Sequence, residues 1–194
     1  MNIANKITLA RVVMIPIFLV FMIPQYIPFL SGWIANAGEG MVNIFAWIAL
    51  GIFCLASVTD FLDGYIARKY NMVSNFGKFM DPLADKLLVC SALICLLTLG
   101  KINVWIVLVI IARDFIISGF RLVASNNGVV IAADMSGKIK TTLQMIMIIC
   151  LIPNISLPFY GIFVLVLEIL VVVLTIYSLF ECMIKNKGVL ADKK

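Results

Sequence analysis

The sequence predicts an all-α, polytopic membrane protein with six transmembrane helices and a short N-terminal interfacial helix. Of its 194 residues, 63% are hydrophobic, whereas soluble domains are about 45–50% apolar. The mean hydropathy is +1.13. Apolar runs long enough to cross a bilayer as helices, about 20 residues each, recur along the chain. Short polar segments separate them, and no stretch remains for a separate soluble domain.

The expected elements follow one another within a single membrane domain, residues 1–194. Residues 1–10 mix polar and apolar side chains, which favours a helix at the membrane interface. The spans are expected at residues 8–24, 42–66, 79–99, 104–125, 138–153 and 161–184. Residues 32–40 are expected to form an exposed loop, and 185–194 a cytoplasmic tail. Ala35-Asn36-Ala37 resembles a signal-peptide cleavage site, but it lies well beyond the first apolar run, which disfavours cleavage.

The basic residues predict which side of the membrane each loop faces. The N-terminus, the 60–85 segment, the 125–137 loop and the C-terminal tail are expected on one side, and of fifteen Lys and Arg only Lys101 falls in a loop or helix end on the other side. Because basic loops remain in the cytoplasm, the side of the N-terminus is expected to be cytoplasmic. The net charge of +5 is dispersed over helix ends, so we expect no nucleic-acid partner.

Composition also limits the chemistry. The chain contains no histidine, so a phosphohistidine intermediate or a histidine base is excluded. A general base must be a carboxylate or a lysine. The five cysteines form no pattern typical of a metal site or a disulfide framework.

Four carboxylates lie between two apolar runs, although the chain has only ten acidic residues. Asp60 and Asp63 are spaced i,i+3 on one expected helix, and Asp81 and Asp85 i,i+4 on the next. Pro82 suits the first turn of that second helix. The polar residues 69–78 between the pairs indicate a turn, so all four acids are expected at one membrane face.

Converging carboxylates at the edge of a membrane require cations. Oxygen-only ligands favour Mg²⁺, Mn²⁺ or Ca²⁺ over softer metals, and two such ions would suit displacement at phosphorus. An ion-transport site and a set of helix caps are alternative interpretations. The small residues Gly64 and Ala67 would let a ligand approach the helix, and Arg68 suits a phosphate oxygen.

These residues carry a resemblance to a known family. The pattern Asp60-x2-Asp63-Gly64-x2-Ala67-Arg68-x8-Gly77-x3-Asp81-x3-Asp85 resembles the signature of the CDP-alcohol phosphatidyltransferases at all eight positions. The resemblance implies a homodimeric membrane enzyme that transfers a phosphatidyl group from CDP-diacylglycerol to an alcohol. It also implies that the four aspartates bind two divalent cations, with Asp85 acting as general base as well. The CDP site it implies comprises Asn5, Thr8, Gly64, Ala67, Arg68 and Gly77.

A second constellation concerns the acceptor alcohol. Arg113 and Asp114 lie within an apolar span, and Arg121 follows about 80° away around the helix. Lys138 and Lys140 begin a later span. Several cations would suit an acceptor that itself bears a phosphate. The lysines as lipid-headgroup anchors, and the Arg113–Asp114 pair as a helix-packing contact, are alternatives.

The segments around this constellation resemble one branch of the same family, the bacterial phosphatidylglycerophosphate synthases. They are N-I-A-N-K-I-T-L-A-R, R-D-F-I-I-S-G-F-R and G-K-I-K-T-x-x-Q. This resemblance implies sn-glycerol 3-phosphate as the acceptor, held by Arg113, Arg121, Lys138 and Lys140, in a bacterial plasma membrane. Inositol phosphate or serine as acceptor, and an ion-coupled transporter, remain alternatives.

Overall fold

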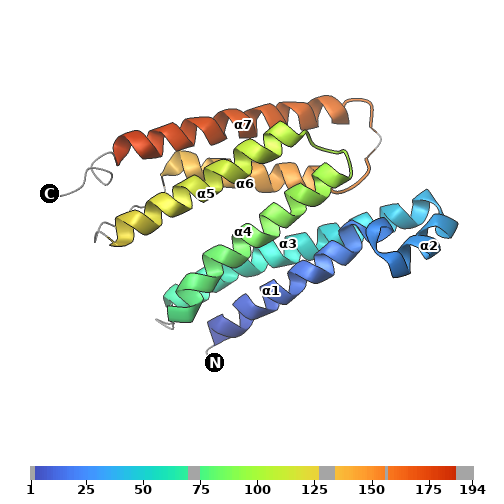
Figure 1. The fold of residues 1–194 in the computed structure, drawn as a ribbon, viewed down its shortest axis with the longest axis horizontal. Coiled ribbons are helices and arrows are strands. Elements are labelled where there is room, and N and C mark those ends of the chain that lie inside the picture. The colour runs from blue at the N-terminus through green and yellow to red at the C-terminus, as the bar shows by residue number, and fades with distance from the viewer. Residues whose placement is uncertain (1–2, 70–74, 127–133, 156, 187–194) are drawn as a thin grey trace. The chain divides into compact units, whose positions relative to one another are not determined.

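The computed structural model confirms the all-α class. It describes residues 3–69, 75–126, 134–155 and 157–186; within the helices, the side chains of residues 3–8, 35, 37, 39, 60–69, 75–82 and 126 lie outside the description. The described elements are α1 Ile3–Met22, the 3-10 helix η1 Pro24–Tyr26, α2 Pro28–Ala37, α3 Glu39–Lys69, α4 Asn75–Thr98, α5 Val104–Asn126, α6 Met135–Leu151 and α7 Tyr160–Lys185 (Figure 1).

Each expected span corresponds to a helix, and α3 to α7 begin and end within about four residues of their expected limits. The N-terminus differs from expectation, because residues 3–22 form one continuous helix rather than a short interfacial helix followed by a separate span. The chain divides into two compact units. The first comprises residues 1–101 and 149–155, and the second comprises residues 102–148 and 156–194.

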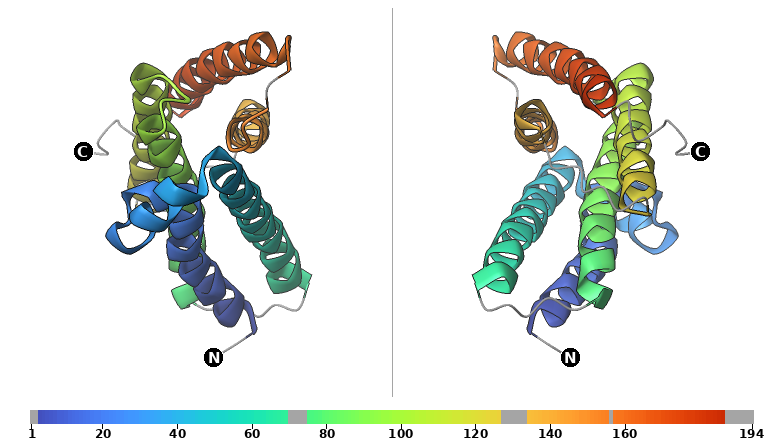
Figure 2. Two further views of the ribbon diagram at one scale, coloured as in Figure 1. Left: turned by 90° about the vertical axis from the view of Figure 1, so that its right-hand side faces the viewer. Right: turned by 90° about the vertical axis from the view of Figure 1, so that its left-hand side faces the viewer.

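In the first unit, α1 packs against both α3 and α4 (Figure 2). Phe18 of α1 is fully buried against Phe53 of α3, with ring centroids 5.9 Å apart. Ala49 and Ala56, also fully buried, keep the buried face of α3 small enough for close helix approach. The other face of α1 exposes Leu9, Val13, Ile17 and Val20, as expected for a helix in contact with lipid.

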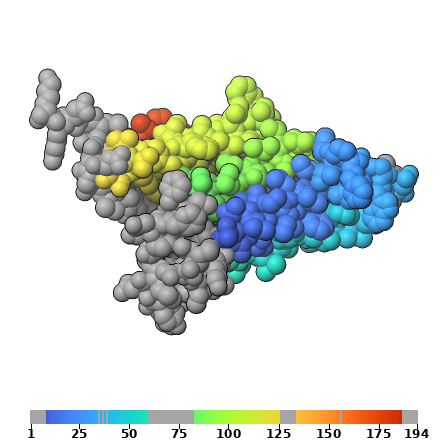
Figure 3. Space-filling view, turned by 60° about the horizontal axis from the view of Figure 1, so that its bottom comes forward, coloured from blue at the N-terminus to red at the C-terminus, as the bar shows by residue number. Residues whose placement is uncertain are grey.

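The prediction of an exposed loop at residues 32–40 is wrong. Most of that segment belongs to α2, which begins with Pro28 at a position where proline's missing N–H costs nothing. Gly38, with φ of 76°, ends α2, and α3 begins at the next residue. A single glycine with a positive φ, a conformation that other residues rarely adopt, thus replaces the expected loop. Figure 3 shows α1 and this neighbouring segment as one continuous surface of the first unit.

In the second unit, α5 packs against α7. Ile117 and Phe120 of α5 form a buried cluster with Cys182 of α7, and Leu179 packs against it. The buried side chains of α7 recur every three or four residues, as in a helix that buries one stripe; they are Val164, Leu167, Glu168, Val171, Thr175, Ser178 and Cys182. Its remaining surface exposes large apolar side chains.

Two described helical segments are long and apolar enough to cross a membrane, Gly40–Thr59 and Tyr160–Lys185, and Leu9–Met22 is a shorter apolar segment. These segments, together with the family described below, indicate a membrane protein. The number of six transmembrane helices stays a prediction, because in the described part of the chain α4, α5 and α6 are not among the helices long and apolar enough to cross a membrane.

Candidate functional site

The four predicted metal ligands lie on two consecutive helices. Asp60 and Asp63 belong to the last part of α3, which ends at Lys69, and Asp81 and Asp85 belong to the first part of α4. The helices adjoin through residues 70–74, so their acidic parts lie at the same end of the first unit (Figure 1). The backbone is therefore compatible with the predicted convergence of carboxylates.

The start of α4 differs from the prediction. The helix begins at Asn75, within the segment 69–78 that was predicted to be a turn. As a result, Pro82 lies about two turns inside the helix and not in its first turn. Proline removes one backbone hydrogen bond there, beside both acids of α4.

Most of the predicted nucleotide and metal residues have side chains outside the described part of the structure. They are Asn5, Thr8, Asp60, Asp63, Gly64, Ala67, Arg68, Gly77 and Asp81. The backbones of all nine belong to helices α1, α3 and α4. Figures 1 and 2 also place the beginning of α1, which carries Asn5 and Thr8, at the acidic end of the first unit.

Asp85 is the one predicted ligand whose side chain is described. It is partly buried, next to Ala84 and close to Leu88, which are both buried. Its interactions include partners within the protein. The signature supplies only carboxylate oxygens, the donor type that hard dications such as Mg²⁺ prefer, so the residues fit a divalent-metal site. Among the described side chains, no group of three potential ligands occurs, because three of the four aspartates lie outside them.

Arg11 is a residue to which the sequence assigned no role. It lies on α1, and its side chain is completely buried in the unit that carries the aspartates. A buried guanidinium is expensive in a membrane protein and marks a functional candidate. The sequence feature that could have identified Arg11 as a candidate is its position near the start of an otherwise apolar run.

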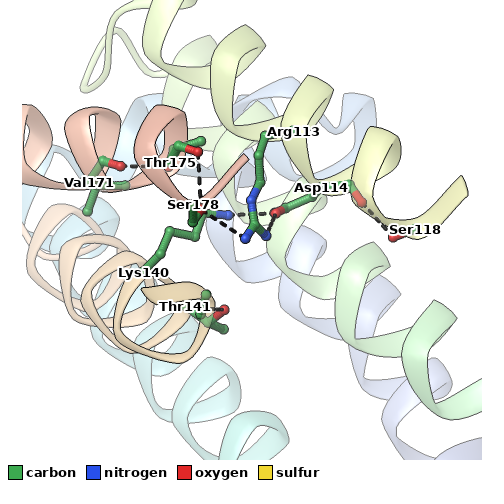
Figure 4. A network of polar contacts seen from close by, with 9 residues as sticks. Arg113, Asp114, Ser118, Lys140, Thr141, Val171, Thr175 and Ser178 are labelled. Atoms are coloured by element: carbon green, nitrogen blue, oxygen red, sulfur yellow. Dashed lines mark hydrogen bonds and ion pairs between the residues drawn. The ribbon is translucent and has the colours of Figure 1, made fainter. Parts of the chain in front are cut away.

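The second unit contains a connected polar network built from three helices (Figure 4). Asp114 of α5 accepts hydrogen bonds from Arg113 Nη1 at 3.0 Å and from Lys140 Nζ of α6 at 2.6 Å. Arg113 Nη2 donates to the hydroxyl of Ser178 on α7 at 2.9 Å. One carboxylate thus compensates two cations, and the network links α5 to both neighbouring helices.

Burial separates the four predicted acceptor residues into two groups. The Lys140 side chain is 1% exposed and that of Arg113 is 13% exposed, so neither is a surface anchor for lipid headgroups. Lys138 and Arg121 are exposed. The structure thus brings Arg113 and Lys140 together around Asp114. The packing role considered for the Arg113–Asp114 pair is compatible with this arrangement.

A second group of contacts joins the start of α6 to the end of α7. Ser136 donates a hydrogen bond to Glu181, and Lys185 Nζ donates to Glu181 at 2.5 Å and to Asp134 at 3.2 Å. The sequence carries no motif at these residues or at Ser178. Most of their side-chain partners lie 45 or more residues away; the exceptions are the i,i+4 pair of Glu181 and Lys185 and the bond from Ser178 to the carbonyl of Thr175. No local pattern could therefore reveal most of these contacts.

Comparison with known proteins defines the class of protein. A model of the CDP-alcohol phosphatidyltransferase family matches residues 1–177, which is most of the chain. The chain therefore belongs to the CDP-alcohol phosphatidyltransferase family, as its signature predicts.

Its relatives carry more specific names. The chain is 48% identical over 158 residues to the CDP-diacylglycerol–glycerol-3-phosphate 3-phosphatidyltransferase of Bacillus subtilis, covering 81% of this chain and 79% of that protein. It is 35% identical over 186 residues to the protein of the same name from Rickettsia felis, covering 93% and 94%. A probable phosphatidylglycerophosphate synthase of Mycobacterium tuberculosis is 37% identical over 176 residues, covering 90% and 78%.

Proposed function

We propose that this protein transfers the phosphatidyl group of CDP-diacylglycerol to sn-glycerol 3-phosphate, giving phosphatidylglycerophosphate and CMP. The observation that carries the proposal is the complete eight-position signature on α3 and α4. Relatives that match over most of their length carry the name of this activity. The buried cations Arg113 and Lys140 support an acceptor that bears its own phosphate.

Asp60, Asp63, Asp81 and Asp85 would hold two divalent cations, with Mg²⁺ the natural choice and Mn²⁺ compatible with the same donors. When bound, such ions neutralise the diphosphate and the departing phosphate oxygen. The carboxylates would hold the ions where the last part of α3 and the first part of α4 adjoin. Gly64, Ala67, Arg68 and Gly77, with Asn5 and Thr8 of α1, would bind the cytidine nucleotide.

Asp85 would act as general base. It removes the proton from the primary hydroxyl of glycerol 3-phosphate, whose oxygen then forms a bond to the lipid-side phosphorus. The bond from that phosphorus to the CMP oxygen breaks, and CMP leaves with the electron pair. A carboxylate suits this role in a chain without histidine.

Arg113, Arg121, Lys138 and Lys140 would hold the phosphate of the acceptor. Arg113 presents a planar fork of donors that matches phosphate oxygens, and Lys140 adds a point charge beside it. The acyl chains would remain among the membrane lipids, and the site would face the cytoplasm of a bacterial cell with the chain crossing the plasma membrane several times. The working form would be a homodimer of single-domain chains.

The proposal is tested by measuring CMP release from CDP-diacylglycerol by the purified protein in detergent. We expect release only with glycerol 3-phosphate and a divalent cation, complete loss with excess EDTA, and recovery when Mg²⁺ is restored. A panel with glycerol 3-phosphate, inositol phosphate and serine identifies the acceptor from the headgroup of the product. Release supported by serine or inositol phosphate alone, or activity that survives chelation, would overturn the proposal.

A further inference from the structure

Ser178 lies in a helix for which the sequence provides no functional motif. It belongs to the buried stripe of α7, and its side chain is 2% exposed. One turn earlier, Thr175 is completely buried, and its hydroxyl donates to the carbonyl of Val171 in its own helix. The hydroxyl of Ser178, by contrast, reaches a side chain of another helix.

The orientation of the Ser178 hydroxyl is fixed by two hydrogen bonds. It donates its proton to the carbonyl of Thr175 at 3.2 Å. A serine hydroxyl has a single proton, so its oxygen is left as an acceptor, and Arg113 Nη2 donates to it at 2.9 Å (Figure 4). The helix backbone of α7 thereby determines where one end of the Arg113 guanidinium lies.

Gly137 limits the position of the same guanidinium from the side of α6. A Cβ atom placed on Gly137 would lie 3.3 Å from Arg113 Nη2, which is closer than most Cβ contacts. The absence of a side chain at residue 137 therefore provides the space that Arg113 occupies. Nη1 is held by its bond to Asp114 of α5. Residues of three helices, α5, α6 and α7, therefore define the position of the Arg113 guanidinium.

A further donor of Arg113, its Nε–H, points to an acceptor that the described parts of the neighbouring helices do not supply. The Nε atom is buried and has no hydrogen-bond partner in the described part of the chain. Buried donors in folded proteins are usually satisfied, and an exception needs an explanation such as a functional role. A phosphate oxygen is an acceptor of the required kind, and Lys140 supplies a second cation near it.

We infer that Ser178 and Gly137 are positioning residues, which act through Arg113 to set the affinity for the acceptor phosphate. This inference rests on the proposed function, in which Arg113 binds that phosphate. Ser178 holds Nη2 by a hydrogen bond and Gly137 leaves it room, so that the guanidinium is oriented before the acceptor binds. Pre-orientation lowers the entropy cost of binding.

The first test is Ser178→Ala. We expect the KM for glycerol 3-phosphate to rise about 3- to 10-fold, the size expected for loss of one typical hydrogen bond. The kcat and the KM for CDP-diacylglycerol should change less than about twofold. Ser178→Thr keeps the hydroxyl and should restore most of the affinity. Thr175→Val is the control, because it removes a buried hydroxyl of the same helix that does not contact Arg113.

The second test is Gly137→Ala, which distinguishes positioning from a structural role. Alanine favours helix over glycine by about 1 kcal/mol, so thermal stability should be kept or increased. The guanidinium must nevertheless shift by a few tenths of an ångström, and the KM for glycerol 3-phosphate should rise. Gly119→Ala on α5 is the matched control, because a Cβ there meets nothing within 4 Å.

A double-mutant cycle with Arg113→Lys completes the design. Lysine keeps the charge but lacks the fork that reaches both partners, so Ser178→Ala should add less than about twofold in that background. Three results would each overturn the inference. They are a full Ser178→Ala effect on the KM in the Arg113→Lys background, equal KM increases for both substrates, and normal KM values in both Ser178→Ala and Gly137→Ala. If those KM values are normal but Arg113→Gln raises the KM for glycerol 3-phosphate, the proposed function remains intact. Without that increase, the acceptor-site assignment fails as well.

Discussion

At the scale of single residues, Asp114 makes a buried cationic pair tolerable. Lys140 is almost completely buried, and its ammonium lies 2.6 Å from the Asp114 carboxylate. A charge in a membrane interior is costly unless it is paired, and the same carboxylate also pairs with Arg113. The Asp114 carboxylate therefore pairs with both cations within the protein.

Asp114→Ala should consequently destabilise the protein strongly. Removing one member of a buried ion pair leaves an uncompensated charge and costs about 3–5 kcal/mol. Asp134→Ala is the comparison, because its partner Lys185 is 53% exposed and an exposed pair contributes about 0–1 kcal/mol. Thermal unfolding in detergent should show a much lower Tm for Asp114→Ala, and similar Tm values for the two variants would contradict this interpretation.

A second prediction at the scale of single residues concerns Asp85, the proposed general base. Asp85→Asn keeps the size of the side chain but cannot accept the hydroxyl proton. Turnover should fall by at least about 10²- to 10⁴-fold, as is typical when a general base is lost. CMP release by the purified variant measures the effect, with Asp134→Asn as an acid-to-amide control outside the signature. Turnover within tenfold of the parent protein would exclude Asp85 as the base.

At the scale of elements, the contacts of Lys101 explain why this residue departs from the predicted distribution of basic residues. It lies in the link between α4 and α5, and its Nζ donates to the carbonyls of Leu151 at 3.0 Å and Ile152 at 2.5 Å. Leu151 is the last residue of α6, whose final carbonyls lack partners within the helix. Lys101 is therefore a cap for α6 and does not act as a topology signal.

This cap predicts a pH dependence of stability. Burial lowers the pKa of Lys101 from 10.5 to about 8, because desolvation disfavours the ammonium. Between these values the unfolded chain binds a proton that the folded chain has released, so the free energy of unfolding should rise with pH from about 8 to 10.5. Thermal unfolding across this range should show that contribution in the parent protein and not in Lys101→Met. Parallel pH profiles would contradict the assignment.

At the scale of the whole molecule, the arrangement of basic residues predicts the topology. Residue 135 should face the cytoplasm and residue 157 the opposite side. Single cysteines introduced as Met135→Cys and Leu157→Cys occupy positions that are 71% and 63% exposed. In intact cells, a membrane-impermeant maleimide should label only Leu157→Cys, and both variants should be labelled after the membrane is disrupted. The reverse pattern would invert the proposed orientation. Labelling of the parent protein measures the background from its five native cysteines.

The sequence predicted most of the helices because their signals are local. Apolar runs located α3 to α7 within a few residues, and the aspartate spacing identified the family. It missed α2, because residues 32–40 were interpreted as a loop, whereas within that stretch a positive φ occurs at Gly38 alone. It also placed the start of α4 too late, because the polar residues after Asn75 resembled a turn.

Composition, periodicity and motif spacing by themselves determined that this chain is an all-helical member of its family. Composition needs no structure, and periodicity and motif spacing depend on residues close together in the sequence. The tertiary structure decided which buried groups meet. Arg113 meets Ser178 across 65 positions, Asp114 meets Lys140 across 26, and Lys101 reaches the end of α6 across 50. These pairings depend on how the helices pack, and helix packing is set by complementary surfaces distributed over the whole element.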